Sequence, residues 1–249
     1  MVSFFNRLAA PAAVAIAALA ASVVPACAMS VSPIHTEMTT TGRASRAQIT
    51  VSNDSGAPLP VEAAIDSFAM DEAGGLKRTK AGDEFLVFPP QALIPAGGSQ
   101  VFRVQWVGEP DLQQSRSYML SLTQIPVKLP KGKSAVQVVM SFGVMINVAP
   151  PQGRPELKVV GSGIERDKQG KLHPTVTVED SSSVHGLLEN SAIRVVAGSY
   201  SKTYSAQEVS QQIGIGLVQP GRRRKFVLPD VLPNDASQVQ VSLEHQAKQ

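Results

Sequence analysis

The sequence has a single cysteine, few aromatic residues and little charge. One of its 249 residues is Cys, 5% are aromatic and 17% are charged. A lone cysteine excludes a disulfide-stapled miniprotein. The 43% of apolar residues are enough to fill a core, which excludes a disordered, charge-rich tail. The formal net charge is only +3 and the basic residues are scattered, so nucleic-acid binding is not expected.

The first 28 residues have the pattern of a cleaved signal peptide. Arg7 supplies a positive start, residues 8–24 form an Ala-rich apolar run, and residues 26–28 (ACA) give the small-x-small pattern of a cleavage site. A membrane span and a lipid-modified Cys27 are the alternatives, but Pro11 interrupts the apolar run. No later apolar run reaches the roughly 18 residues of a spanning helix, so stable membrane insertion is not expected. The sequence therefore predicts export.

The rest of the chain is typical of β-structure. Short runs rich in β-branched residues recur, and Gly, Pro, Asn, Asp and Ser residues separate them. Residues 205–212 (SAQEVSQQ) predict one short helix or a loop. The predicted strands cover residues 47–51, 61–68, 85–88, 101–107, 118–125, 136–148, 157–160, 175–178, 192–196, 226–228 and 239–243.

The strand spacing predicts an all-β fold with two immunoglobulin-like β-sandwich domains. Strands every 8–12 residues or so favour a sandwich over βαβ units, and about seven strands per 100 residues is the immunoglobulin-like density. Residues 150–155 (PPQGRP) form a short Pro-rich linker. We therefore predict a first domain over residues 29–149 and a second over residues 156–249.

Local signatures of catalysis or metal binding are scarce. The four histidines lack metal-ligand spacing and are interpreted as surface or turn residues, and no G-x-S-x-G elbow occurs. An acidic stretch suggests paired carboxylates of a hydrolase, although a solvated loop is the simpler interpretation; its members are Asp66, Asp71, Glu72, Asp83 and Glu84. We expect no enzyme activity, no metal and no cofactor.

One run of basic residues follows a turn-like Pro-Gly pair. Residues 222–225 read RRRK. Such a quartet is able to contact lipid head groups, nucleic acid or an acidic partner. The simpler interpretation is the solvated start of a hairpin, since no aromatic residue interleaves with the run.

The run over residues 136–148 (VQVVMSFGVMINV) differs from the other predicted strands. It is about 13 residues long, where about 5–6 is typical, and all its even positions are apolar. Because side chains alternate along a strand, these residues share one face. That face is either the core face of a long last strand or an edge offered to a partner by strand addition.

Several segments resemble periplasmic pilus-assembly chaperones of the PapD type. The resemblance covers about residues 31–150 and depends on the order and spacing of its segments. These are residues 51–54 (VSND), 88–90 (FPP), 93–97 (LIPAG), 100–104 (QVFRV) and 118–126 (YMLSLTQIP), followed by the long strand and the linker.

The resemblance implies a periplasmic chaperone. Such a protein completes the unfinished fold of a pilus or fimbrial subunit with its long strand, and delivers the subunit to an outer-membrane usher. By position, the donor side chains are Val136, Val138, Met140 and Phe142. A secreted two-domain structural or adhesion module is the alternative function.

Two positions depart from the family pattern. The family anchors the subunit's terminal carboxylate with an Arg and a Lys, where this sequence has Glu37 and Met145. Neither side chain is a cation; Arg43, Arg46 and His35 are candidate substitutes. The short segment 127–134 (VKLPKGKS) resembles the short-loop chaperones, of which the adhesive fimbrial branch and the branch of spore-coat-like secreted pili both stay open.

Overall fold

The computed structural model of the chain describes residues 29–126 and 138–245. The predicted signal peptide (residues 1–28) and the predicted donor residue Val136 lie outside the described residues. Within those described ranges, no helix is long and apolar enough to cross a membrane.

Strands β1 to β10 form two sheets that pack face to face. One sheet has the order β1-β3-β8-β6, and the other has the order β2-β10-β9-β4-β5, with β7 also paired to β4. The strands are β1 (Met29–Ser32), β2 (His35–Thr39), β3 (Arg46–Asn53), β4 (Leu59–Met70), β5 (Leu76–Lys80), β6 (Phe85–Phe88), β7 (Gln91–Ile94), β8 (Ser99–Trp106), β9 (Arg116–Gln124) and β10 (Ser141–Ala149), with a 3-10 turn, η1 (Arg43–Ser45), after β2.

Strands β11 to β18 form the second domain. Its sheets have the orders β11-β12-β17 and β15-β14-β18, and a short ribbon pairs β13 with β16. The elements are β11 (Leu157–Arg166), β12 (Leu172–Asp180), β13 (Gly186–Leu187), η2 (Leu188–Asn190), β14 (Ser191–Ala197), β15 (Tyr200–Tyr204), α2 (Ala206–Gln212), β16 (Leu217–Val218), β17 (Arg223–Val227) and β18 (Gln240–His245).

The segment 205–212, predicted as one short helix or a loop, contains the helix α2. It begins after Ser205, whose hydroxyl accepts a hydrogen bond from the backbone N–H of Glu208, while the Glu208 side chain accepts one from the Ser205 backbone. This capping box satisfies two backbone donors that a helix start otherwise leaves unpaired. Val209 buries the apolar side of the helix against the second domain's core.

Each domain has its own apolar core. In the first, Phe85 packs edge-on against Trp106 and Tyr118, with ring centroids 5.1 and 4.8 Å apart. The buried Asn53 amide donates hydrogen bonds to the carbonyls of Ala57, Ile94 and Pro95, and so ties two loops to the end of β3. The core of the second domain surrounds the fully buried Tyr204.

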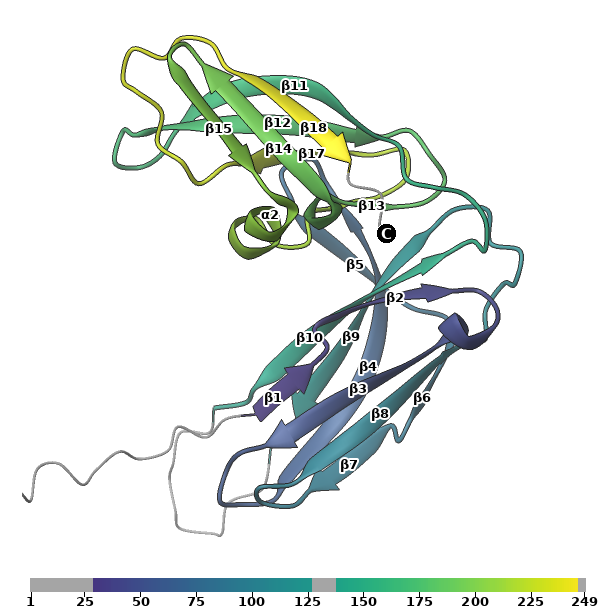
Figure 1. Cartoon of the computed structure of the whole chain (residues 1–249). Coiled ribbons are helices and arrows are strands. Elements are labelled where there is room, and N and C mark those ends of the chain that lie inside the picture. Colours follow the sequence, from purple (N-terminus) through teal and green to yellow (C-terminus); the bar gives the residue numbers. More distant parts are fainter. Residues whose placement is uncertain (1–28, 127–137, 246–249) are drawn as a thin grey trace, which may run out of the picture.

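The two domains meet at an angle and leave a concave side between them (Figure 1). The β4–β5 hairpin extends from the first domain to the second, and β2 and β10 end close to the junction. The outer face of the β2-β10-β9-β4-β5 sheet is therefore the surface that the second domain contacts.

Candidate functional site

Strand β10 is paired along nearly its whole length on one side and along about half of it on the other. Strand β9 pairs antiparallel with residues 141–148, whereas β2 pairs parallel with residues 145–149. The first contact on the β2 side is the hydrogen bond from Met145 N–H to the Ile34 carbonyl, at 3.0 Å. No strand among the described residues pairs with the β2 side of residues 141–144.

The open edge results from the path of the chain between β1 and β2. Strand β1 pairs with β3 in the opposite sheet, so the chain changes sheets at residues 33–34 before β2 joins β10. Because Pro33 has no N–H, it has no donor with which to extend β2. On its β2 side, β10 therefore has unpaired backbone groups over residues 141–144, before β2 joins it.

The apolar stripe of the predicted strand divides into a core part and an accessible part. Val144, Ile146 and Val148 are fully buried in the first domain's core. Met140 and Phe142 are only partly buried and pack against the edge of that core. Val138 is 76% exposed. The core interpretation therefore holds for Val144, Ile146 and Val148, whereas donation by the more exposed part of the stripe stays a prediction.

The strand itself is shorter than predicted. A strand was expected over residues 136–148, but β10 spans Ser141–Ala149 and residues 138–140 have no regular strand structure. Their only backbone link to β9 among the described residues is the hydrogen bond from Gln124 N–H to the Met140 carbonyl, at 2.8 Å. Residues 138–140 therefore continue the apolar pattern but lack a complete set of strand hydrogen bonds to β9.

The opposite face of β10 contributes to the contact between the domains. Met145 packs at the edge of an apolar cluster built from both domains. This interdomain cluster contains Phe68 and Met119 from the first domain and Leu187 and Leu217 from the second, with Met70, Met145 and Ile215 around them. An apolar side chain at position 145 thus serves packing.

Glu37 lies on β2, two positions from the residue that pairs with Met145, and it binds across the domain boundary. The parallel register sets Glu37 opposite Asn147 and His35 opposite Met145. Glu37 Oε1 accepts a hydrogen bond from Asn147 Nδ2 at 2.9 Å, and Glu37 Oε2 forms a short contact with His185 Nε2 of the second domain. The two predicted anchor positions are thus neighbours, but neither presents a cation.

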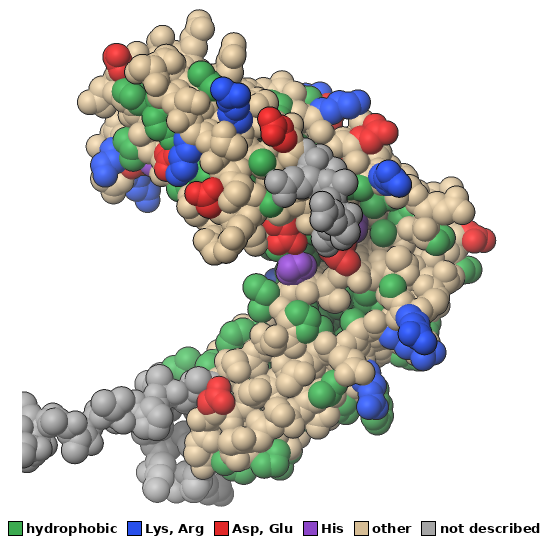
Figure 2. Space-filling view, in the orientation of Figure 1, with side chains coloured by type: hydrophobic (Ala, Val, Ile, Leu, Met, Phe, Trp, Pro, Cys, Tyr) green, Lys and Arg blue, Asp and Glu red, His purple; other side chains and the backbone are tan. Residues whose placement is uncertain are grey.

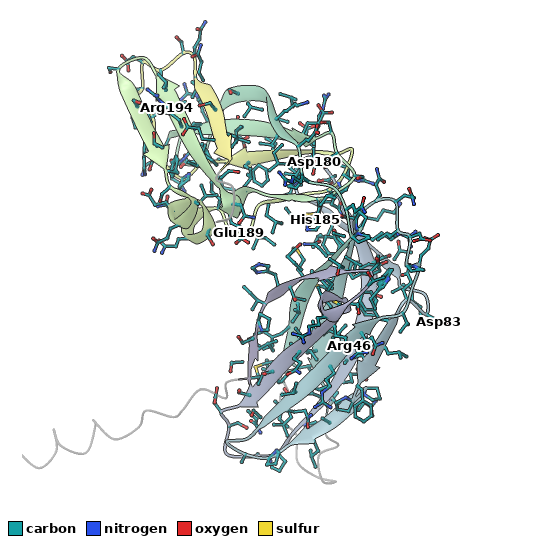
Figure 3. The ribbon with its side chains drawn as sticks, turned by 45° about the vertical axis from the view of Figure 1, so that its right-hand side comes forward. Arg46, Asp83, Asp180, His185, Glu189 and Arg194 are labelled. Carbon is teal, nitrogen blue, oxygen red and sulfur yellow. The ribbon has the colours of Figure 1, made fainter. Side chains whose placement is uncertain are left out.

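A second carboxylate–histidine pair runs in the opposite direction. His35 Nε2 lies 3.4 Å from Glu189 Oε1, so each domain contributes one His and one Glu to the junction. Figure 3 shows His185 and Glu189 on the side of the second domain that faces the first, and His and acidic side chains gather at the inner bend in Figure 2. Burial raises the Glu37 pKa, but the hydrogen bonds and charge of His185 lower it further, so the net shift is downward.

The histidine prediction was wrong for His185. That side chain is only 4% exposed, although the sequence suggested a surface or turn residue. Its position follows from contacts to Glu37 and from the backbone hydrogen bond of His185 N–H to Ser115 Oγ, both in the first domain. The spacing of these partners along the chain gives no local signal.

Most side chains of the basic run 222–225 have partners within this protein. Arg223 pairs with Glu179 at 3.2 Å and Lys225 pairs with Glu165 at 2.7 Å. Arg224 is partly buried, where it donates to the Leu217 carbonyl at 3.3 Å and lies over the Phe226 ring. These pairs do not support the reading of the run as a site for lipids, nucleic acid or an acidic partner.

The β4–β5 hairpin joins the domains through backbone and amide hydrogen bonds. Gln219 accepts from the Met70 N–H at 2.8 Å and donates to the Phe68 carbonyl at 3.1 Å. Lys225 N–H donates to the Glu72 carbonyl at 2.7 Å. These bonds hold the end of the long strand β4 against the second domain.

The acidic residues of the hydrolase hypothesis do not converge. Asp66 lies within β4, opposite Lys80 of β5, whereas Asp71 accepts from Gly75 N–H in the hairpin turn. Glu84 pairs with Arg116 at 2.8 Å. Among the described residues, no group of three or more His, Cys, Asp or Glu side chains has the geometry to hold a metal ion.

Comparison with known proteins identifies the first domain. Residues 30–152 match the family described as pili and flagellar-assembly chaperone, PapD N-terminal domain. These residues belong to that chaperone family. The predicted resemblance to PapD-type chaperones is confirmed, and this is a class of binding proteins rather than of enzymes. The comparison with curated proteins gave no match.

Solved structures similar to this chain include fimbrial chaperones. The class 5 fimbriae chaperone CfaA has a TM-score of 0.50 at 11% identity and covers 88% of this chain and 100% of its own. The CsuC–CsuE chaperone–tip adhesion subunit complex of Acinetobacter baumannii gives 0.52 at 12% identity, with 87% and 97% covered. The Salmonella enterica complex of SafA pilin with the SafB chaperone gives 0.50 at 13% identity, with 89% and 97% covered. The predicted fold of two immunoglobulin-like sandwiches is thus confirmed.

Proposed function

We propose that this protein is a periplasmic chaperone that binds pilus or fimbrial subunits by donor-strand complementation. The observation that carries the proposal is the open edge of β10, beside an apolar stripe that starts in the core and becomes exposed. A strand of the subunit would gain backbone hydrogen bonds along the β10 edge. Alternate side chains of β10 would fill the groove in the subunit. The family match and the known complexes with a pilin and a tip subunit support subunits as the partners.

The donor side chains in this proposal are Val136, Val138, Met140 and Phe142. Of the three described residues, Val138 has the most surface left to bury, and Met140 and Phe142 are partly available. Complete burial of a side chain of this kind contributes about 1.5–3 kcal/mol. Since association and side-chain ordering oppose binding, only part of the gross gain appears as affinity.

The proposal has three further parts. The predicted signal peptide 1–28 directs the chain to the periplasm, and the mature chain divides into domains 29–149 and 156–249 with the linker 150–155. The chaperone passes its subunit to an outer-membrane usher. Leu86, Phe88 and Leu93 are 60–68% exposed outside the β10 edge, which leaves apolar surface for a second partner.

The decisive experiment captures the partner from a native periplasm. The protein is purified with whatever it binds, and the complex is weighed intact by native mass spectrometry. A Val138→Glu, Met140→Glu double variant is run in parallel. Val227→Glu, at a 51% exposed position on β17 of the second domain, is the matched control.

We expect a one-to-one complex with a small immunoglobulin-like subunit, which the double variant loses and the control retains. Circular dichroism checks that each variant is folded. If the folded double variant keeps the same partner, donation by the β10 edge is refuted. If the double variant unfolds, the exposed part of the stripe is core and the two-domain structural module becomes the better interpretation.

A further inference from the structure

A pocket of about 250 Å³ opens between the two domains beside Glu37. Strand β2 contributes Glu37 and Met38, the linker contributes Pro155, and the second domain contributes Val184, His185 and Leu187. Thr39, Ala149 and Asn190 complete the lining, so the largely apolar walls carry a carboxylate, an imidazole, a hydroxyl and an amide. We refer to it as the interdomain pocket.

The His185 ring beside Glu37 has one nitrogen that lacks a partner. An ionised carboxylate accepts and does not donate, so His185 Nε2 must carry the hydrogen that it shares with Glu37. The other ring nitrogen, Nδ1, points away from that contact. His185 Nδ1 is buried and has no hydrogen-bond partner in the described part of the chain.

Asn147 adds an unpartnered acceptor. Its side chain is completely buried, and its amide nitrogen donates to Glu37. The amide oxygen, on the same carbon atom, has no partner among residues 29–126 and 138–245. Buried polar atoms without partners are rare in proteins because each one costs about 1–3 kcal/mol.

Glu37 itself keeps capacity for a further ligand. Its side chain is 39% exposed. Its two oxygens accept one bond each from Asn147 and His185, whereas a carboxylate offers about four acceptor positions. The group is therefore oriented by its partners but not saturated.

The charges on this face disfavour an anionic ligand. Glu189 lies close by, paired with His35, and adds a second carboxylate. The pairing register sets Arg78 in the same row as Glu37, but Arg78 belongs to β5 at the opposite edge of the sheet. Strands β10, β9 and β4 lie between them, each about 4.8 Å apart.

We propose that the interdomain pocket binds a Lys or Arg side chain of the captured subunit, a step that rests on the proposed function. The apolar walls would take the aliphatic stem of such a side chain, and Glu37 would take its charged head. The chaperone would thus hold its subunit near the end of the β10 edge by a cation rather than by a terminal carboxylate. Glu37 is two residues along β2 from His35, which lies opposite Met145 where the open edge ends.

The first test uses small probes on the mature chain. Nitrogen-15 NMR of the imidazoles follows titrations with N-acetyl-lysine N-methylamide, with its Nε-acetylated analogue, and with N-acetylglycine as a free carboxylate. We expect only the lysine ammonium probe to shift the His185 signals, and Glu37→Gln to weaken that response about tenfold. Glu62→Gln, at an exposed carboxylate of β4, is the matched control.

The probe titrations also define failure. A response to N-acetylglycine with none to the ammonium overturns the proposal, because the pocket would then be a carboxylate anchor. No specific response to either probe also overturns it. A response that appears only after removal of residues 246–249, which include Lys248, would reassign the pocket to the chain's own end and would overturn the assignment to the subunit.

The second test uses the complex from the periplasm. Glu37→Gln should speed dissociation of the subunit about tenfold, and charge exchange should restore it, with Glu37→Lys paired with a Lys→Glu or Arg→Glu subunit variant. If Val138→Glu, Met140→Glu loses the subunit but Glu37→Gln does not change its dissociation, the chaperone function stands and the cation pocket is refuted. A native circular dichroism spectrum of Glu37→Gln at the assay temperature separates this effect from unfolding.

Discussion

Replacing Val138 or Val144 by Ala removes the same two carbon atoms from two positions of one apolar stripe. Val144 is fully buried in the first domain's core, whereas Val138 is 76% exposed. Two buried carbons are worth about 1.6 kcal/mol in transfer free energy, and the residual cavity increases the cost. We therefore expect Val144→Ala to lower the free energy of unfolding by about 2–3 kcal/mol. Val138→Ala should change it by less than about 0.5 kcal/mol.

Urea unfolding followed by the fluorescence of Trp106 measures this difference, because Trp106 is buried in the same core. The effects on subunit binding should have the reverse order. Val138→Ala should lower the affinity for the subunit although it hardly changes the free energy of unfolding. Equal losses of stability in the two variants would refute the division of the stripe into a core part and an accessible part. So would a stable Val144→Ala variant with unchanged urea midpoint.

Three further predictions concern the junction and the helix. The folded-state pKa of Glu37 is lowered below 4.5, so ionised Glu37 stabilises the fold above that pH. The fold loses this contribution as the pH falls through the folded pKa. In urea titrations, the stability difference between wild type and Glu37→Gln should therefore disappear in acid. Gln219→Ala leaves the Phe68 carbonyl and the Met70 N–H without their partner, so we expect the free energy of unfolding to fall by about 1–3 kcal/mol. Small-angle X-ray scattering should then show a wider range of interdomain angles. An unchanged scattering curve would contradict this prediction. Ser205→Ala removes the helix cap and should cost about 1 kcal/mol in thermal unfolding, with Ser205→Asp restoring stability.

Local patterns predicted much of the fold. The strand at Phe85–Phe88 was predicted because a short β-rich run before prolines is a property of neighbouring residues. The sequence after Ser205 predicts a short helix or a loop, and the capping box of the structure decides for the helix. Strand β2 was missed because HTEMT buries only Met38 and is too short and polar to show alternation. The short strands β13 and β16 have two residues each and carry no periodicity.

The site was less predictable than the fold. The family resemblance pointed to positions 37 and 145, and the register makes these neighbours of the same strand pair. Nothing local linked Glu37 to His185, because 148 positions separate them and they come from different domains. The basic run 222–225 looked free in the sequence because its acidic partners, Glu165 and Glu179, lie on strands β11 and β12.

The interdomain cluster also has a consequence for the order in which the chain is made. Phe68, Met70 and Met119 belong to segments that are synthesised early, whereas Leu187 and Leu217, which cover them, come about 70–150 residues later. Until those residues arrive, the newly made first domain presents a bare apolar face to its surroundings. A fragment that stops at the linker would keep that face exposed, and we expect it to aggregate more readily than the full chain.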